Sequence, residues 1–187
     1  MIPKLESSAK RCSPILGSSE AVNMPDLYVS WEEYHAKIEQ LATQIYQSQW
    51  EFDHILCLAR GGLRIGDILS RIYNKPLAIL STSSYGGKDC QERGNLTIAS
   101  NITMTTATLG KRILLVDDLV DSGVTLVRIL EWLKQYEESA ITEVRSAVIW
   151  FKACSVAKPD YYVDFLPDNP WIHQPFEKYE KLNHSDL

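Results

Sequence analysis

The sequence predicts an α/β fold, in which a mostly parallel β-sheet is flanked by helices. Two short runs, Phe52–Leu58 and Ile113–Val116, are largely apolar, which is typical of strands buried on both faces of a sheet. Each run is followed by a turn that contains glycine and then by apolar residues at helical spacing. Strands that alternate with helices in this way favour parallel pairing, because the helix carries the chain back across the sheet.

Length and composition are those of one ordinary globular domain. The chain has 187 residues, of which 45% are hydrophobic and 23% are charged, so it can bury a sizeable core. A net charge of −5 without a basic block argues against general affinity for nucleic acid or anionic membranes. No apolar run reaches the length of a membrane span. We therefore expect a cytoplasmic protein that binds neither nucleic acid nor a membrane.

The four cysteines are far apart in the sequence and form no CxxC pair. They are Cys12, Cys57, Cys90 and Cys154. Cys57 lies within an apolar run that reads as a strand, so we expect a reduced, buried thiol there rather than a disulfide.

Residues 1–23 differ in composition from the rest of the chain. They contain five serines, scattered charges and no sustained periodicity, so we expect a disordered extension before a single domain at residues 24–187. The apolar core of a secretory signal is missing from this stretch. Met24 directly precedes the domain, and one hypothesis is that translation of the native protein starts there.

Local patterns locate the first helices and strands. Ser30-Trp31-Glu32-Glu33 has the form of a capping box, and the apolar residues behind it recur at helical spacing as far as Tyr46. The strand at 52–58 leads into Leu58-Ala-Arg-Gly-Gly-Leu63 and then into a second helix through Ile72. This order of strand, glycine turn and helix forms a cradle for an anion, although a purely structural turn is the alternative.

The remaining strands surround one long polar stretch. Pro76–Ser81 predicts a strand, whereas Thr82 to Met104 is rich in small and polar residues, as is typical of a lid. Within it, two β-like runs at 96–99 and 102–105 favour a mobile hairpin. Val144–Phe151 predicts another buried strand, and Asp160–Phe165 an edge strand.

Residues 113–125, Ile-Leu-Leu-Val-Asp-Asp-Leu-Val-Asp-Ser-Gly-Val-Thr, combine the parts of a phosphate site with carboxylates. A strand that enters a helix through small residues points backbone N–H groups at an anion, and the helix dipole adds to the attraction. Ser122 and Thr125 add hydroxyl donors, and Gly123 lets the backbone close around a phosphate. Asp117 and Asp118 are suited instead to sugar hydroxyls or to Mg²⁺. The alternative, a plain turn with Ser122 as a helix cap, is disfavoured by the order of all thirteen residues.

This segment resembles the signature of the type I phosphoribosyltransferases, which bind 5-phosphoribosyl 1-pyrophosphate (PRPP). The resemblance runs from Tyr28 to Glu177 and is greatest to the 6-oxopurine branch, of the bacterial xanthine-guanine type. It implies the type I phosphoribosyltransferase fold, with a flexible hood loop and a C-terminal segment that binds the base. It also implies Mg²⁺ as cofactor and assembly as a homo-oligomer, either a dimer or a tetramer.

The resemblance assigns the PRPP site to two loops. Arg60 and Gly61 would hold the pyrophosphate, with a cis peptide bond expected at Ala59–Arg60. The 5′-phosphate would be cradled by Asp121, Ser122, Gly123, Val124 and Thr125, where Val124 contributes only its backbone N–H.

Four further residues complete the predicted PRPP and metal site. Asp117 and Asp118 would hold the ribose hydroxyls, directly or through the metal. Glu177 stands where the family usually has an aspartate that serves the metal and pyrophosphate side of the site. Arg93 matches an arginine of the hood that contacts pyrophosphate, with an ordinary exposed loop arginine as the alternative.

The predicted base site lies near the C-terminus. By resemblance, Lys152 donates to the 6-oxo group, Trp171 stacks on the base, and the backbone carbonyl of Ile172 accepts from a 2-amino group. Without the resemblance, Lys152 would be read as a solvated strand end and Trp171 as a core residue. His173 replaces an acid of the family, which leaves its role open. Asp121 is the expected general acid/base at purine N7.

We therefore expect a purine-salvage enzyme that joins xanthine, guanine or hypoxanthine to PRPP and releases pyrophosphate. The alternative is a regulatory protein of the same fold that senses PRPP or a nucleotide without turnover. A pyrimidine or orotate enzyme is a third possibility, but it would lack the pair of Lys152 and Trp171-Ile172. The sequence does not rank the three purines, because they differ only at C2.

Overall fold

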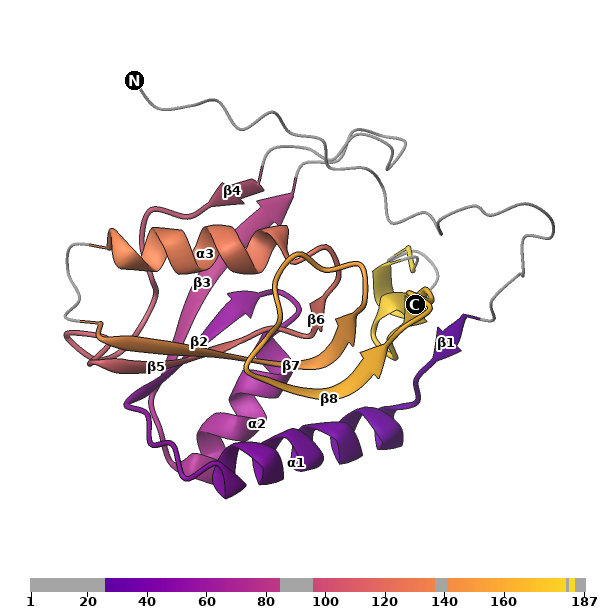
Figure 1. Cartoon of the computed structure of the whole chain (residues 1–187), viewed down its shortest axis with the longest axis horizontal. Coiled ribbons are helices and arrows are strands. Elements are labelled where there is room, and N and C mark those ends of the chain that lie inside the picture. The colour runs from indigo at the N-terminus through magenta and orange to yellow at the C-terminus, as the bar shows by residue number, and fades with distance from the viewer. Residues whose placement is uncertain (1–25, 85–95, 137–140, 181, 184–187) are drawn as a thin grey trace.

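The computed structural model describes residues 26–84, 96–136, 141–180 and 182–183, and these form the predicted α/β fold (Figure 1). The main sheet has seven strands in this part of the chain, in the order β4-β3-β2-β5-β7-β6, and β8 also pairs with β7. Among the described strands of this sheet, only β3 and β4 pair antiparallel. The strands are β1 (Leu27–Tyr28), β2 (His54–Ala59), β3 (Leu77–Ser84), β4 (Leu96–Ile98), β5 (Arg112–Val116), β6 (Leu119–Val120), β7 (Glu143–Lys152), β8 (Tyr161–Leu166) and β9 (Ile172–His173). The helices are α1 (Trp31–Gln47), α2 (Leu63–Tyr73), α3 (Val124–Lys134) and the 3₁₀ helix η1 (Glu177–Glu180).

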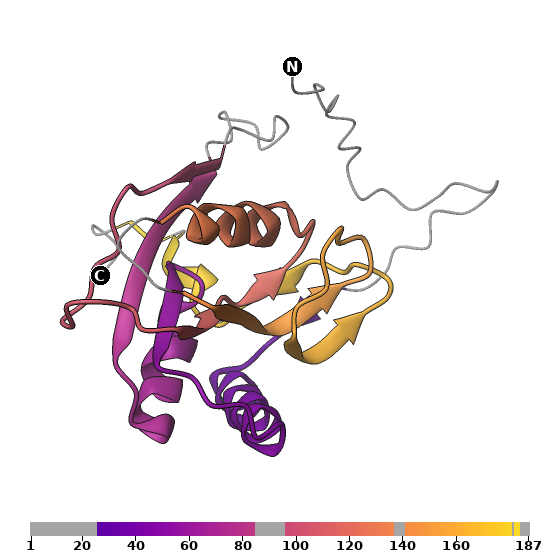
Figure 2. The ribbon, with the colours of Figure 1, turned by 60° about the vertical axis from the view of Figure 1, so that its left-hand side comes forward.

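Helices cover both faces of the sheet (Figures 1 and 2). On one face, α1 and α2 bury Ile38 and Ile65 in the same core as Leu114. On the opposite face, α3 buries Ile129 in a second core with Leu115. Leu114 and Leu115 are neighbours in β5 that point to different cores, because side chains alternate along a strand. The apolar run of β5 is thus explained by burial on both faces.

The capping box at the start of α1 is confirmed. The backbone N–H of Glu33 donates to Ser30 Oγ at 3.2 Å, and the backbone N–H of Ser30 donates to Glu33 Oε2 at 2.8 Å. Two of the N–H groups that a helix start leaves unpaired are thereby satisfied. None of the helices in the described ranges is long and apolar enough to cross a membrane.

The predicted hairpin between residues 96–99 and 102–105 is wrong. Both segments pair with β3 instead: β4 runs antiparallel to its end, with Thr82 opposite Ile98, and Thr103 forms a bridge with Ile79. β3 extends three residues beyond the predicted end at Ser81, and its outer edge offers backbone groups to both segments. Long-range pairing with this edge therefore replaced local pairing within the segment.

A second, two-stranded sheet joins distant parts of the chain. β1 pairs in parallel with β9, with Leu27 opposite Ile172 and Tyr28 opposite His173. This pairing attaches the C-terminal segment to the residues that precede α1. The predicted extension at residues 1–23 lies outside the described residues.

Cys57 is a free, fully buried cysteine, as predicted. Its position in β2 faces Gly66 of α2, and burial raises the pKa of the thiol to about 12. A Cβ atom at Gly66 would fall directly on the sulfur of Cys57. Glycine at this point allows α2 to pack closely against β2.

We predict that Gly66→Ala destabilises the protein although alanine favours helix formation. The added methyl group would collide with Cys57 Sγ, and overpacking of this kind costs about 1–3 kcal/mol. Thermal unfolding should show a lower Tm, by ~2–4 °C for each kcal/mol lost. The double variant Gly66→Ala/Cys57→Ala removes the obstructing sulfur and should recover much of the loss. Equal destabilisation of the single and the double variant would contradict this explanation.

Candidate active site

The loops after β2 and β5 lie against each other at one edge of the sheet. The two strands are parallel neighbours with Cys57 opposite Val116, so their carboxyl ends coincide. A Cβ atom at Gly62 would fall on the carbonyl oxygen of Val116, and one at Gly61 would fall on the carboxyl group of Asp118. Glycine at both positions therefore permits a contact between the loops that any side chain would obstruct. The peptide bond between Ala59 and Arg60 is cis, as expected.

The turn after β6 leads into α3 without a side-chain cap. Its N-cap is Gly123, with φ +76°, and no side chain caps the helix, so the interpretation of Ser122 as a cap is wrong. The first N–H groups of α3 are therefore open to an anion. The loop after β7 supports this turn, because the backbone N–H of Val156 donates to the carbonyl of Ser122 at 3.0 Å.

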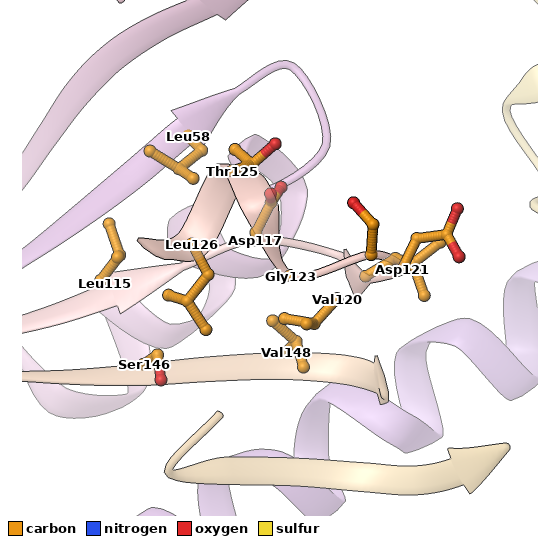
Figure 3. A pocket seen from close by; sticks show the side chains of 12 residues that line it. Leu58, Leu115, Asp117, Val120, Asp121, Gly123, Thr125, Leu126, Ser146 and Val148 are labelled. Carbon is orange, nitrogen blue, oxygen red and sulfur yellow. The ribbon is translucent and has the colours of Figure 1, made fainter. Parts of the chain in front are cut away.

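A pocket of about 100 Å³ lies beside this turn (Figure 3). Its polar side includes Asp117, Asp121 and Thr125, whereas Leu115 and Val148 supply part of the apolar side. Ser122 and Gly123 also line it, so four of the five residues predicted to cradle the phosphate meet at one cavity.

Asp117 and Asp118 form a crowded acidic pair between the two loops. Both are half-buried, and Asp117 Oδ1 accepts the backbone N–H of Asp118 at 3.0 Å. Burial, and then the adjacent Asp118 carboxylate, raise the pKa of Asp117 well above its usual range. A cation bound at this pair would relieve the repulsion between the two carboxylates.

Lys152 and Asp121 meet at the end of β7. Lys152 Nζ lies 3.4 Å from Asp121 Oδ1, and the lysine side chain is only 8% exposed whereas the aspartate is 53% exposed. Lys152 is the last residue of β7, and Asp121 directly follows β6, the parallel neighbour of β7. The interpretation of Lys152 as a solvated strand end is wrong, since the ammonium group is held inside beside a carboxylate.

The C-terminal segment approaches the acidic pair through Gln174. Its Nε2 donates to Asp118 Oδ2 at 2.5 Å, and the side chain is buried. Ile172 is also buried, but Trp171 is 64% exposed, so the interpretation of Trp171 as a core residue is wrong. His173 stacks on Tyr28, and its Nε2 lies 2.8 Å from Asp26 Oδ2.

The structure does not bring every predicted residue together. Arg60 is exposed and forms an ion pair with Glu180 of η1, at 3.2 Å. Glu177 lies 3.7 Å from His173 Nδ1, and within the described ranges no three His, Cys, Asp or Glu side chains form a group that could hold a metal ion. Arg93 lies outside the described residues.

Two residues near the site received no role from the sequence. Gln174 contacts Asp118, and Glu180 contacts Arg60. Gln174 belongs to the segment that resembles a base-binding motif, which is the signal in the sequence that could have singled it out. Its partner, Asp118, is apparent only from the fold. Glu180 lies beyond the resemblance, and we find no local signal for it.

Known proteins resemble both the sequence and the fold. The xanthine-guanine phosphoribosyltransferase of Gluconobacter oxydans is 30% identical over 156 residues, which are 80% of this chain and 83% of that protein. The protein of the same name from Idiomarina loihiensis is 28% identical over 153 residues, 81% of this chain and 87% of that one. The crystal structure of a purine phosphoribosyltransferase from Pyrococcus horikoshii Ot3 matches with a TM-score of 0.65 and 28% identity, covering 80% of this chain and 92% of that chain.

A family model described as the phosphoribosyl transferase domain matches residues 30–181. The match includes both glycine-containing loops, the acidic pair, Lys152 and the segment around Gln174. The chain therefore belongs to the phosphoribosyl transferase domain family.

Proposed function

We propose that this protein is a Mg²⁺-dependent purine phosphoribosyltransferase of the salvage type. It converts xanthine, guanine or hypoxanthine and PRPP into the nucleoside monophosphate and pyrophosphate. The names of its relatives support purine as the substrate class. The assignment to the cytoplasm and the assembly as a dimer or tetramer stay predictions.

The pair formed by Lys152 and Asp121 is the observation that carries this proposal. O6 and N7 of a 6-oxopurine lie side by side on one edge of the base. A lysine ammonium and a carboxylate 3.4 Å apart can face such an edge, with Lys152 donating to O6 and Asp121 facing N7. Adenine carries an amino donor at position 6, which the ammonium would repel. The pair thus favours 6-oxopurines over adenine.

The same arrangement suggests how a proton leaves the base. N9 attacks C1′ of the ribose as the bond from C1′ to pyrophosphate breaks. The proton on N7 passes to the carboxylate of Asp121, so that the purine ring of the product carries no positive charge. General acid–base assistance of this kind contributes roughly 10²–10⁴-fold to rates. In the reverse direction, Asp121 returns the proton.

The other predicted residues surround this reaction in our proposal. Residues 121–125 hold the 5′-phosphate on the open start of α3, and Arg60 and Gly61 hold the pyrophosphate. Trp171 is exposed and can stack on the base, while Ile172 would offer its backbone carbonyl to a 2-amino group.

Mg²⁺ fits the acidic pair, because two adjacent carboxylates are hard oxygen ligands for this ion. Asp117 and Asp118 would hold it, and the ion would offset the charge of the pyrophosphate and the two carboxylates. Glu177 lies 3.7 Å from His173 Nδ1, and its role on the metal side of the site stays a prediction.

A regulatory protein that senses PRPP or a nucleotide without turnover is the less favoured alternative. A sensor needs the phosphate loop but has no need for a buried lysine beside Asp121. The relatives are named as transferases, which also favours the enzyme.

We predict turnover of 6-oxopurines by the purified protein with Mg²⁺ and PRPP. Xanthine, guanine or hypoxanthine should give nucleotide, whereas adenine, uracil and orotate should not. Asp121→Asn should lower kcat by roughly 10²–10⁴-fold, because the amide cannot take the N7 proton. Binding of PRPP without turnover of any base would instead identify a sensor.

We predict that Lys152→Met lowers kcat/KM for hypoxanthine by about 10–100-fold, since charged hydrogen bonds contribute ~1.5–3 kcal/mol. The KM for PRPP should change much less, because Lys152 faces the base. Lys134→Met, at the exposed end of α3, is the matched control and should behave as the wild type. An unchanged kcat/KM for hypoxanthine in Lys152→Met would exclude the proposed contact with O6.

A further inference from the structure

Gln174 makes the one hydrogen bond described between the C-terminal segment and the acidic pair. Its Nε2 donates to Asp118 Oδ2 at 2.5 Å across 56 positions in the sequence. The other oxygen of that carboxylate, Oδ1, lies where a side chain at Gly61 would fall. The Asp118 carboxylate is thus enclosed by Gln174 on one side and by the Gly61 turn on the other.

The backbone around Gln174 is fixed on both sides. The backbone N–H of Val29 donates to the carbonyl of His173 at 3.0 Å, which anchors the residue before Gln174 to the small sheet. The backbone N–H of Glu177 donates to the carbonyl of Gln174 at 3.0 Å, which closes the turn into η1. Gln174 therefore reaches Asp118 from a firmly held position.

The orientation of the amide is determined by the charge of its partner. If the amide were reversed, its oxygen would face the carboxylate of Asp118 and repel it. In the observed orientation, Gln174 Oε1 is buried and has no hydrogen-bond partner among the described residues. A buried acceptor without a partner destabilises a protein, so the stability of the fold alone does not explain a glutamine at this position.

We propose that Gln174 is a positioning residue, which holds the Asp118 carboxylate in the orientation that receives the ribose and metal side of PRPP. This inference rests on the proposed function. Gln174 acts through Asp118 and need not touch the reacting atoms. Because only His173 separates it from Ile172, Gln174 also connects the base-binding segment to the PRPP site. Partners that orient ligand-binding carboxylates typically matter by 10–100-fold in affinity or activity.

The test is Gln174→Met, which keeps the approximate volume and removes both polar atoms. Direct binding of PRPP in the presence of Mg²⁺, without a purine, is measured by equilibrium dialysis, and the Tm by thermal unfolding. We expect the Kd for PRPP to rise by about 10-fold or more, the KM for the purine to change less than about threefold, and the Tm to stay equal or rise. If Gln174 had only a structural role, Gln174→Met would instead lower the Tm and leave the binding of PRPP unchanged. Gln40→Met, on the exposed side of α1, is the matched control.

A double-mutant cycle shows whether Gln174 acts through Asp118. Gln174→Met should have little further effect on PRPP binding in an Asp118→Ala background, because the carboxylate to be oriented is gone. A PRPP Kd of Gln174→Met within about twofold of the wild type, or a full additive loss in the Asp118→Ala background, overturns the inference. Failure of the wild type to bind PRPP or to form nucleotide would instead overturn the proposed function.

Discussion

The close contact between the Gly61–Gly62 turn and residues 116–118 is the constraint on which the site depends. Strands β2 and β5 are parallel neighbours, so the loops that leave them compete for the same space. Glycine at both positions allows the two loops to pack together, because side chains there would fall on the Val116 carbonyl and the Asp118 carboxyl. As a result, the starts of α2 and α3 open at one edge of the sheet, where parallel α/β folds bind their ligands.

Charge in the site is arranged around this contact. Three aspartates, Asp117, Asp118 and Asp121, lie where we propose that an anionic substrate binds. Lys152 offsets only Asp121, and the acidic pair has the amide of Gln174 as its neutral partner. An anionic substrate can approach such carboxylates when a divalent cation accompanies it. The repulsion that raises the pKa of Asp117 has the same origin as the proposed affinity for Mg²⁺.

The C-terminal segment depends on contacts with residues far away in the chain. The pairing of β9 with β1 fixes Ile172 and His173 against the residues before α1, and Gln174 extends this connection to Asp118. Glu180 adds an ion pair with Arg60, although both side chains are largely exposed, and such pairs contribute little to stability. The proposed base site and PRPP site are therefore linked through buried contacts more than through surface charge.

Local signals were sufficient for much of the fold and for part of the site. Serine and glutamate three residues apart fix the start of α1, and the apolar run 113–116 predicts β5, because capping and double-sided burial act within a few residues. The order of residues 117–125 likewise led to the proposed phosphate loop. The pairing of β4 with β3, the pairing of β1 with β9 and the contact of Gln174 with Asp118 were decided only by the tertiary structure. Each of these joins backbone or side-chain groups that become neighbours only when the sheet assembles, and no local pattern in the sequence encodes which distant partner will satisfy them.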